Sequence, residues 1–390
     1  HGHSRNHLTH RPGNTGPETA MKQFVCKPTI HMFPTCKDFL AGFDIGEDDL
    51  VLSNAYIFKP FFDGLACRAQ ALFLEDYGQG EPSDTMVDAL LAAASRHHFR
   101  RVIAIGGGSV IDVAKVLAVA PTGSDTSAVF DSKELKQEKE LIILPTTCGT
   151  GSEVTNISII NRTCLGIKVG LVHDSLYARH AVLVPELLEK LPYPVFATSS
   201  LDALVHAVES YLSTAASPFT RMFSAEAIRL ILAGYTEVAL HGKDGLRPLL
   251  GDFLLASTYA GLAFGTAGCA TVHAMSYPLG STFHIPHGES NYAVFAGVLR
   301  HYEQQQVPGL ADLQELLGRE LGCPASRAMD SLDALLQKIL PLKRLSAYGM
   351  EPSQARPFAE AVLRTQQRLL AHSPKEMTVA DMSGIYTALL

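Results

Sequence analysis

The segment GTAGCATVHAMSYPLGSTFHIPHGESN, residues 265–291, combines small and apolar residues with three histidines, His273, His284 and His287. Neutral imidazole is the commonest protein ligand for a transition metal, and histidine is depleted from apolar cores unless it has a partner. A hydrogen-bonded core histidine or a solvated loop would explain any one of them taken alone. The segment therefore needs support from elsewhere in the chain before it indicates a metal site.

Asp202 and His206 provide that support, because their i, i+4 spacing places both side chains on one face of a helix. A surface hydrogen bond would explain this pair by itself. However, the neighbouring residues make the face partly apolar, where a buried carboxylate without a partner is costly. With His273 and His287, the pair forms a carboxylate-plus-three-imidazole set that suits Fe(II) or, alternatively, Zn(II). Glu209 is expected to be an ordinary helix partner and not a ligand.

A glycine-rich turn, GGGSVIDVAK from Gly106, joins an apolar run to a helical pattern. Glycines let the backbone approach a ligand, and free N–H groups at a helix N-terminus attract phosphate. The turn is neither G-x-G-x-x-G, since position 111 is Ile, nor a Walker loop, since Lys115 lies inside the helix. A tight turn without a ligand is the alternative interpretation.

A second loop of small polar residues, PTTCGTGSEVT from Pro145 to Thr155, follows the next apolar run. Loops after adjacent parallel strands open at the same edge of a sheet, where nucleotides bind. We therefore expect pyrophosphate binding, with phosphate and ribose oxygens meeting the hydroxyls of Ser109, Thr146, Thr147, Thr150 and Ser152. Lys168 is expected to neutralise or hydrogen-bond the cofactor, although a solvated lysine is the alternative. A dinucleotide cleft beside such a metal implies hydride transfer with Lewis-acid help.

Strand and helix patterns alternate in the first half of the chain, which predicts a mostly parallel sheet. The expected strands are residues 50–53, 71–74, 101–105 and 141–144, and a helix over 85–98 is capped by Ser83 or Asp84. Amphipathic helical patterns dominate after Pro185. We expect an α/β domain over residues 21–187 and an all-helical metal-binding domain over 188–390. The His-, Gly- and Pro-rich residues 1–20 are interpreted as a disordered leader or tag.

Composition excludes several classes of partner. The 390 residues carry a net charge of −7, which argues against nucleic acid because phosphate binding needs a basic surface. No apolar run approaches the roughly 20 residues that cross a bilayer, which argues against a membrane partner. The seven cysteines are scattered and never form C-x-x-C, as in a reducing cytoplasm. The expected partner is a small-molecule alcohol or aldehyde.

Four motifs in order, GGGSVIDVAK, PTTCGTGSEVT, LDALVHAVE and HAMSYPLGSTFHIPHGESN, resemble the iron-containing (group III) alcohol dehydrogenases. The resemblance covers essentially Met21 to Leu390. It implies the architecture that this family shares with dehydroquinate synthase: an α/β dinucleotide-binding domain, an all-α domain, and cofactor and metal in the cleft between them. It also implies a homodimer or larger homo-oligomer.

The resemblance implies roles for individual residues. The implied metal ligands are Asp202, His206, His273 and His287. The implied cofactor-binding residues are Gly107, Gly108, Ser109, Thr146, Thr147 and Thr150. Asn54, Asp112, Ser152 and Lys168 are added to them as further cofactor-binding candidates. Tyr277 replaces a histidine that many members carry four residues after the one matching His273, so Tyr277 and His284 are the candidates for proton transfer. A packed ring is the alternative for Tyr277.

Asn54 replaces an aspartate that NAD-preferring members often carry near the end of the first strand. A neutral side chain does not repel a 2′-phosphate, so NADP is not excluded. NAD is expected only because the most similar members of the family favour it. Ser199 and Ser200 replace the usual Thr-Gly, with little consequence.

The segments YIFKPF, EDYGQGEPSD and SYPLGSTFHIPHGESNY are most similar to members that oxidise 4-hydroxybutyrate to succinate semialdehyde. No carboxylate-binding group is identified; His284, Asn291 and an unplaced lysine or arginine are candidates. Another small primary alcohol or diol is therefore the alternative substrate. A dehydroquinate synthase-like lyase and a non-enzymatic nucleotide-binding protein are further alternatives. The lyase would need basic residues that the metal segment lacks, and the non-enzyme would not need the four ligands together.

Overall fold

The first domain is built on a parallel β-sheet. In the computed structural model, which describes residues 23–390, six strands pair in the order β1-β8-β5-β4-β2-β3. Their bounds are β1 (Thr29–Met32), β2 (Asp49–Ser53), β3 (Gln70–Phe73), β4 (Arg101–Gly106), β5 (Glu140–Pro145) and β8 (His180–Leu183). Every pairing is parallel. The predicted leader, residues 1–20, lies outside the described residues.

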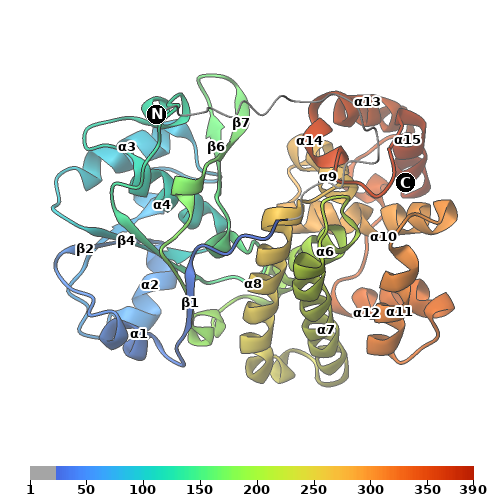
Figure 1. The fold of residues 1–390 in the computed structure, drawn as a ribbon, viewed down its shortest axis with the longest axis horizontal. Coiled ribbons are helices and arrows are strands. Elements are labelled where there is room, and N and C mark those ends of the chain that lie inside the picture. The colour runs from blue at the N-terminus through green and yellow to red at the C-terminus, as the bar shows by residue number, and fades with distance from the viewer. Residues whose placement is uncertain (1–22) are drawn as a thin grey trace, which may run out of the picture.

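Helices cover both faces of this sheet (Figure 1). They are α1 (Cys36–Gly42), α2 (Ala55–Phe62), α3 (Asp84–Ala94), α4 (Gly108–Val119) and α5 (Thr126–Phe130). Successive residues of β2 point to opposite faces: Leu50 and Leu52 pack with the α3–α4 side, while Val51 packs with the α1–α2 side. All six residues of β4 are buried, as expected for a central parallel strand.

The helix predicted over residues 85–98 is shorter than expected. Ser83 caps α3 by accepting a hydrogen bond from the Met86 amide, but the helix ends at Ala94. Ser95 turns its hydroxyl back to the Ala92 carbonyl, and the chain then bends toward β4. A side-chain oxygen that competes for a helix carbonyl favours such an ending.

Four strands were missing from the prediction: β1, β8, and the two strands of an antiparallel hairpin, β6 (Ile157–Arg162) and β7 (Ile167–Val172). The strand β1 carries a histidine between half-exposed neighbours, so its pattern is not that of a buried strand. The hairpin is largely solvent-exposed along β7. It follows the short 3₁₀ helix η2 (Ser152–Val154), and it packs against α4 and α3.

The second domain is all-helical over the described residues. Its helices are α6 (Tyr193–Leu212), α7 (Pro218–His241), α8 (Leu250–Ala267), α9 (Thr271–Phe283), α10 (His287–Gln305), α11 (Leu310–Leu321), α12 (Ala328–Ile339), α13 (Ala355–Thr365), α14 (Gln367–Leu370) and α15 (Val379–Ala388). The two domains lie side by side, with α6, α7 and α8 packed together (Figure 1). This places α6 and α8 next to the sheet domain.

The segment Arg247–Ala267 is long and apolar enough, by length and composition alone, to cross a membrane. However, 56% of its most apolar window is buried inside the molecule. Since α8 packs against both α6 and α7, the burial is that of a core helix.

Candidate metal and cofactor site

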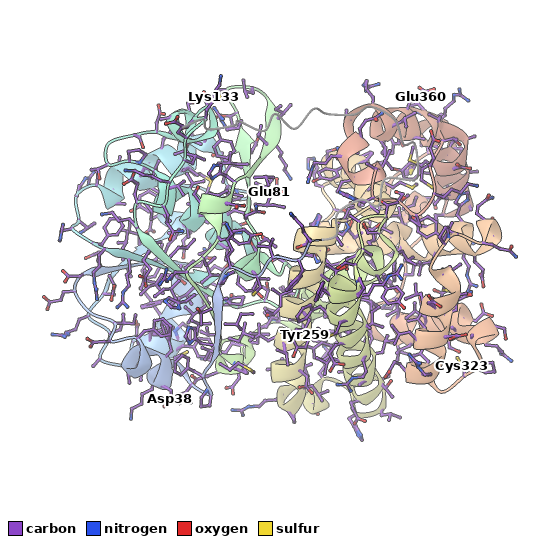
Figure 2. The ribbon with its side chains drawn as sticks, viewed as in Figure 1. Asp38, Glu81, Lys133, Tyr259, Cys323 and Glu360 are labelled. Atoms are coloured by element: carbon purple, nitrogen blue, oxygen red, sulfur yellow. The ribbon has the colours of Figure 1, made fainter. Side chains whose placement is uncertain are left out.

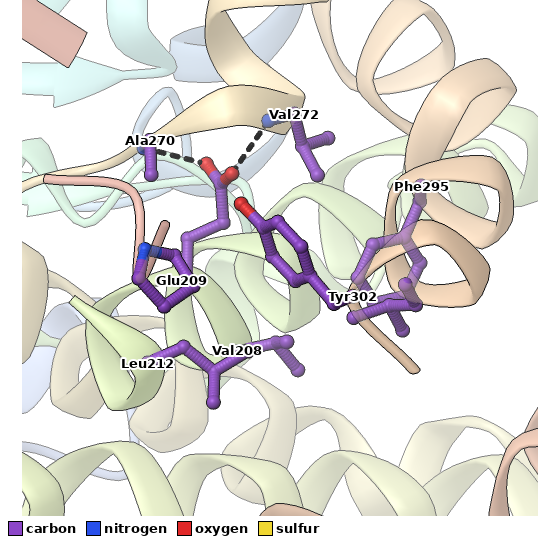
Figure 3. Close-up of a pocket in the computed structure, with 9 residues that line it drawn as sticks. Val208, Glu209, Leu212, Ala270, Val272, Phe295 and Tyr302 are labelled. Atoms are coloured by element: carbon purple, nitrogen blue, oxygen red, sulfur yellow. Dashed lines mark hydrogen bonds between the residues drawn. The ribbon is translucent and has the colours of Figure 1, made fainter. Parts of the chain in front are cut away.

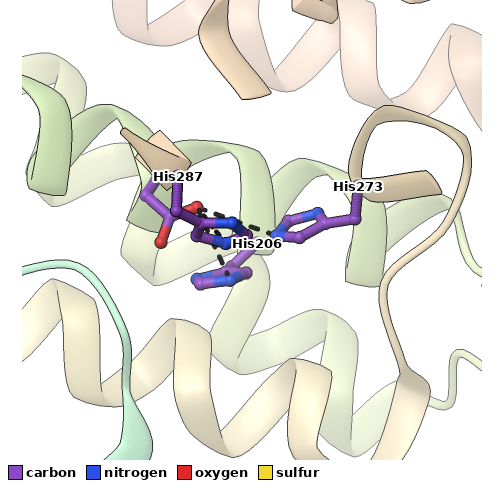
Figure 4. Close-up of side chains that lie close together, drawn as sticks. His206, His273 and His287 are labelled. Carbon is purple, nitrogen blue, oxygen red and sulfur yellow. Dashed lines mark ion pairs between the residues drawn. The ribbon is translucent and has the colours of Figure 1, made fainter. Parts of the chain in front are cut away.

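The predicted metal ligands come from three helices of the second domain. Asp202 and His206 are one turn apart on α6, His273 lies in the first turn of α9, and His287 is the first residue of α10. The Asp202 Oδ1 atom lies 3.6 to 3.8 Å from the Nε2 atoms of all three imidazoles. Figure 4 shows these rings turned toward one another, and the four ligand atoms lie within 4.8 Å of one another. Two ligands about 2.1 Å from one tetrahedral ion are about 3.4 Å apart, so the four residues fit a single ion.

The protonation of two buried ligands, His206 and Asp202, also suits a cation. Burial lowers the pKa of His206 to about 4, although the Asp202 carboxylate opposes this shift. Burial alone would raise the pKa of Asp202, but the surrounding imidazoles outweigh it and hold that pKa below its usual range. Neutral imidazole and ionised carboxylate are the forms that bind a metal. Burial alone would lower the pKa of His273, but Cys269, Asp202 and Glu209 outweigh it and raise that pKa, so metal binding there would release a proton.

The ligand set is open on one side, at His287. Its side chain is 56% exposed, whereas Asp202, His206 and His273 are almost fully buried. His287 is the first residue of α10, directly after the N-cap residue Pro286. A Cβ at Gly288 would lie 2.3 Å from the Thr198 carbonyl oxygen of α6, so only glycine lets these two helices approach this closely. The exposed side of His287 gives a substrate oxygen access to the ligand set.

Glu209 was expected to be an ordinary helix partner, but it holds His273 in place. Its carboxylate accepts hydrogen bonds from His273 Nδ1 at 2.7 Å and from the backbone amides of Ala270 and Val272 at 2.9 and 2.6 Å. Figure 3 shows Glu209 between these amides and a small apolar cavity that Phe295 also lines. With Nδ1 protonated by this bond, His273 turns its Nε2 lone pair toward Asp202. Sequence reasoning missed this role because the partners lie more than 60 residues away along the chain.

His206 is fixed by a different partner, the cofactor loop. Its Nδ1 atom lies 3.1 Å from the Gly149 carbonyl oxygen, and its ring stacks on Phe264 with centroids 4.2 Å apart. A carbonyl can only accept, so Nδ1 carries the proton and Nε2 is left free for a metal. One candidate metal ligand, His206, is therefore hydrogen-bonded directly to the loop that follows β5.

Asn291 is fully buried against the ligands, which makes it unsuitable as the binder of a substrate carboxylate. Its Nδ2 atom is 2.8 Å from Asp202 Oδ1 and 3.2 Å from the Nε2 atoms of His273 and His287. Its Oδ1 atom has no hydrogen-bond partner among the described residues. The amide is therefore occupied with the metal ligands themselves.

The two predicted cofactor loops lie next to each other at the carboxyl edge of the sheet. Gly106, at the end of β4, pairs with Pro145 at the end of β5, and the Thr146 amide donates to the Gly106 carbonyl. No side chain caps the N-terminus of α4, which begins at Gly108. Thr146 Oγ1 is buried and has no hydrogen-bond partner among residues 23–390. Free helix amides and an unpaired hydroxyl are what a bound phosphate would satisfy.

The second loop is held from behind by Lys115, which sequence reasoning set aside. Its buried ammonium donates to Ser152 Oγ at 3.0 Å, Thr155 Oγ1 at 3.2 Å and the Ile157 carbonyl at 2.8 Å. Burial lowers its pKa, while the charge of Asp112 opposes this. The Ser152 hydroxyl accepts one of these bonds and so supports its own loop, while its O–H proton remains available to donate to a cofactor.

The same loop rests on the helical domain. Gly151 adopts a left-handed conformation with φ 61°, and a Cβ there would lie 2.6 Å from Gly261 Cα on α8. Glu153, fully buried, accepts a hydrogen bond from Thr258 of α8 at 2.8 Å. A residue other than glycine at position 151 would separate the loop from α8.

The other predicted cofactor residues are more dispersed. Asn54 follows β2, and Asp112 lies in α4, where burial raises its pKa and the Lys115 charge opposes the rise. Lys168 lies on β7 and is paired with Glu81 at 2.6 Å. Glu81 lies on the side of the first domain that faces the helical domain (Figure 2). Thr147 and Thr150 are half-buried in the loop after β5.

The two candidates for proton transfer are accessible but are not part of the ligand cluster. Tyr277 is 37% exposed and lies one turn after His273 on α9. His284 is exposed at the end of α9, with a left-handed backbone conformation (φ 54°). Its ring makes no hydrogen bond to the described residues. Both face solvent, so either can exchange a proton with water.

Comparison with known proteins places these features in context. Residues 48–185 match the family described as iron-containing alcohol dehydrogenase, and residues 196–390 match the C-terminal domain of the Fe-containing alcohol dehydrogenase family. The chain is 43% identical over 371 residues to 4-hydroxybutyrate dehydrogenase of Clostridium kluyveri, covering 95% of this chain and 100% of that protein. It is 35% identical to long-chain-alcohol dehydrogenase 1 of Geobacillus thermodenitrificans, covering 79% of each chain.

Solved structures agree in fold. A 1,3-propanediol oxidoreductase superposes with a TM-score of 0.82 at 23% identity, covering 95% of this chain and 100% of the other. Sulfoacetaldehyde reductase from Bifidobacterium kashiwanohense, in complex with NAD⁺, superposes with a TM-score of 0.82 at 24% identity, covering 95% and 98%. At this identity the likeness concerns the fold alone.

Proposed function

The chain belongs to the iron-containing alcohol dehydrogenase family, and we propose that it catalyses the reversible oxidation of 4-hydroxybutyrate to succinate semialdehyde with NAD. The observation that carries the choice of substrate is the 43% identity to the Clostridium kluyveri 4-hydroxybutyrate dehydrogenase over 95% of this chain. The lyase and the non-enzymatic protein are set aside because the family is one of alcohol dehydrogenases.

Asp202, His206, His273 and His287 would hold the metal, Fe(II) or alternatively Zn(II). Such an ion, when bound, stabilises the negative charge that develops on the oxygen of an alcohol losing its proton. Glu209 and the Gly149 carbonyl orient the imidazoles of His273 and His206 by their hydrogen bonds to Nδ1. The exposed side of the ligand set, at His287, admits the hydroxyl of the substrate.

The dinucleotide would be bound by the edge of the sheet. The amides of Gly107, Gly108 and Ser109 at the start of α4 suit its pyrophosphate, and Thr146, Thr147 and Thr150 offer hydroxyls to phosphate or ribose. Asn54, Asp112, Ser152 and Lys168 complete the proposed set, with Ser152 acting through the loop. NADP is the alternative cofactor.

A bound nicotinamide would supply the acceptor for the hydride of the carbinol carbon, and the hydroxyl proton would leave the substrate in the same oxidation. Tyr277, His284 or a chain of water molecules would carry that proton away. The loops align the two carbon atoms, which is the protein's main contribution to hydride transfer.

An ordinary small primary alcohol or diol is the second candidate substrate, and one observation favours it. Burial lowers the pKa of His287, Lys168 lies close enough for its charge to lower it further, and the Lys168 ammonium is already paired with Glu81. A substrate carboxylate needs a cation or several donors, so this pair would have to open for 4-hydroxybutyrate.

We further propose that the chain divides at about residue 187, that it acts in the cytoplasm, and that it forms a homodimer or larger homo-oligomer.

The metal site is tested by His287→Ala, with metal content and NADH binding measured on the same sample. We expect the variant to lose its metal and nearly all turnover of 4-hydroxybutyrate while binding NADH as before, because no cofactor loop includes His287. His284→Ala, three residues away, should keep its metal. Full activity of His287→Ala without bound metal would contradict the site.

A further inference from the structure

A carboxylate lies beside Asn54, at the end of β2, although residue 54 itself is neutral. β2 ends at Ser53, whose hydroxyl donates to the Ile105 carbonyl of β4 at 2.6 Å. Asn54 is the next residue, so it lies beside the glycine-rich turn that follows β4. β3 lies on the other side of β2 and pairs Phe73 with Ser53. The short 3₁₀ helix η1 (Leu74–Asp76) begins directly after β3.

Glu75, in η1, bends back over the end of β2. Its Oε2 atom accepts a hydrogen bond from Asn54 Nδ2 at 2.9 Å, and its Oε1 atom accepts one from the Ala55 amide at 2.6 Å. These two bonds fix the carboxylate at the N-terminus of α2. Asn54 thus positions an acidic group without carrying a charge itself.

The charge of Glu75 is not neutralised. Within residues 23–390, no lysine, arginine or histidine nitrogen comes within ion-pair distance of it. Each carboxylate oxygen has about two acceptor sites, and each is engaged by one bond. Glu75 is half-exposed, so one acceptor site on each oxygen remains for a hydroxyl.

In dinucleotide-binding folds, an acidic residue at the end of the strand beside the phosphate-binding turn accepts a hydrogen bond from the ribose 2′-hydroxyl. The same negative charge repels the 2′-phosphate of NADP, which is specificity by exclusion. The neutral Asn54 suggests from sequence that this acidic residue is missing. In the structure, Glu75 of η1, directly after β3, places a carboxylate there instead.

We infer that Glu75 is the residue that makes this enzyme select NAD over NADP, by accepting a hydrogen bond from the adenosine ribose of NAD and repelling a 2′-phosphate. The inference rests on the proposed use of a dinucleotide. It does not depend on which alcohol is oxidised. It replaces the sequence expectation that a neutral Asn54 leaves NADP open.

The test is equilibrium binding of NADH and NADPH, followed by nucleotide fluorescence without alcohol, for the unmodified protein and three variants. Glu75→Gln removes the charge but keeps an acceptor for the Ala55 amide. Asp76→Asn removes a neighbouring, exposed charge from the same short helix. Asn54→Ala removes the amide contact and leaves the Glu75 charge. Thermal unfolding reports whether each variant is folded.

We expect the unmodified protein to prefer NADH and Glu75→Gln to lower that preference by about tenfold or more, because one like-charge contact is removed. Asp76→Asn should keep the preference of the unmodified protein. Asn54→Ala should keep a smaller preference for NADH, because it loses one of the two bonds that fix the Glu75 carboxylate but leaves its charge. An unchanged ratio in folded Glu75→Gln would overturn the inference, as would an equal loss in Asp76→Asn. If neither nucleotide binds to the unmodified protein, the dinucleotide site itself fails, which is a failure of the proposed function.

Discussion

At the scale of single residues, the ligand set depends on partners that hold each imidazole in one tautomer. His273 donates from Nδ1 to Glu209, and His206 donates from Nδ1 to the Gly149 carbonyl. Such partners fix the ring orientation and raise the basicity of the ligating nitrogen. His287 is exposed and begins a helix, so its position depends on the close approach of Gly288 to α6.

Glu209→Gln tests this support. Glutamine keeps the size of the side chain but replaces one of the two accepting oxygens with an NH₂ group. His273 therefore loses its charged partner, and the start of α9 loses one acceptor. We expect metal affinity to fall about 10- to 100-fold, measured by competition with a chelator. Glu289→Gln is the matched control, because Glu289 is two residues from His287 and bonds to Tyr348, not to a ligand. Equal metal affinity in Glu209→Gln and the control would contradict the role of Glu209.

At the scale of elements, the loop from Pro145 to Thr155 joins the two halves of the site. Lys115 holds it from α4, Thr258 holds it from α8 through Glu153, and its Gly149 carbonyl holds a metal ligand. A shift of this loop would therefore change cofactor and metal binding together.

Lys115→Met tests that coupling. Methionine fills a similar volume but donates no hydrogen bond, so Ser152, Thr155 and the Ile157 carbonyl lose their shared donor. We expect the free energy of unfolding to fall by about 1–3 kcal/mol and the dissociation constant for NADH to rise several-fold. Thermal unfolding and NADH fluorescence measure the two effects. Lys139→Met is the control, because Lys139 donates to the Phe99 carbonyl away from the loop. Unchanged NADH binding in Lys115→Met would show that the loop holds its shape without this lysine.

The elements that were predicted from sequence are those with a strong local pattern. β2, β4 and β5 were found because buried parallel strands are continuous apolar runs, and β3, an edge strand, was found because its residues from Ala71 are also apolar. The pair of Asp202 and His206 on α6 was found because its i, i+4 spacing is also a local pattern. β1 was missed because half-exposed residues and a histidine break the pattern, and β7 because its residues are mostly exposed.

Lys115, Glu209 and Glu75 could not be found in this way. A charged residue inside a helical pattern is normally solvated, and nothing local distinguishes one that is buried. Their partners lie 37 to 42, 61 to 64 and 20 to 21 residues away in the chain. Only the packing of the elements brings these groups together.

At the scale of the whole molecule, a parallel sheet and a helical domain each bring one half of the chemistry. The carboxyl edge of the sheet offers free amides and hydroxyls to a dinucleotide, and the helical domain offers four ligands for one ion. The bond between His206 and the loop after β5 links them. The proposed reaction is therefore a metal-dependent hydride transfer to or from a small substrate that carries a distal carboxylate.

The most direct test of that claim is NADH oxidation by metal-loaded protein with succinate semialdehyde, beside butyraldehyde and propionaldehyde as controls without a carboxylate. Butyraldehyde matches the carbon chain, so the comparison isolates the charge. We predict that kcat/KM is roughly 10- to 100-fold higher for the semialdehyde, because a charge-assisted hydrogen bond to its carboxylate is worth that much. Equal kcat/KM values for the three aldehydes would contradict 4-hydroxybutyrate as the substrate.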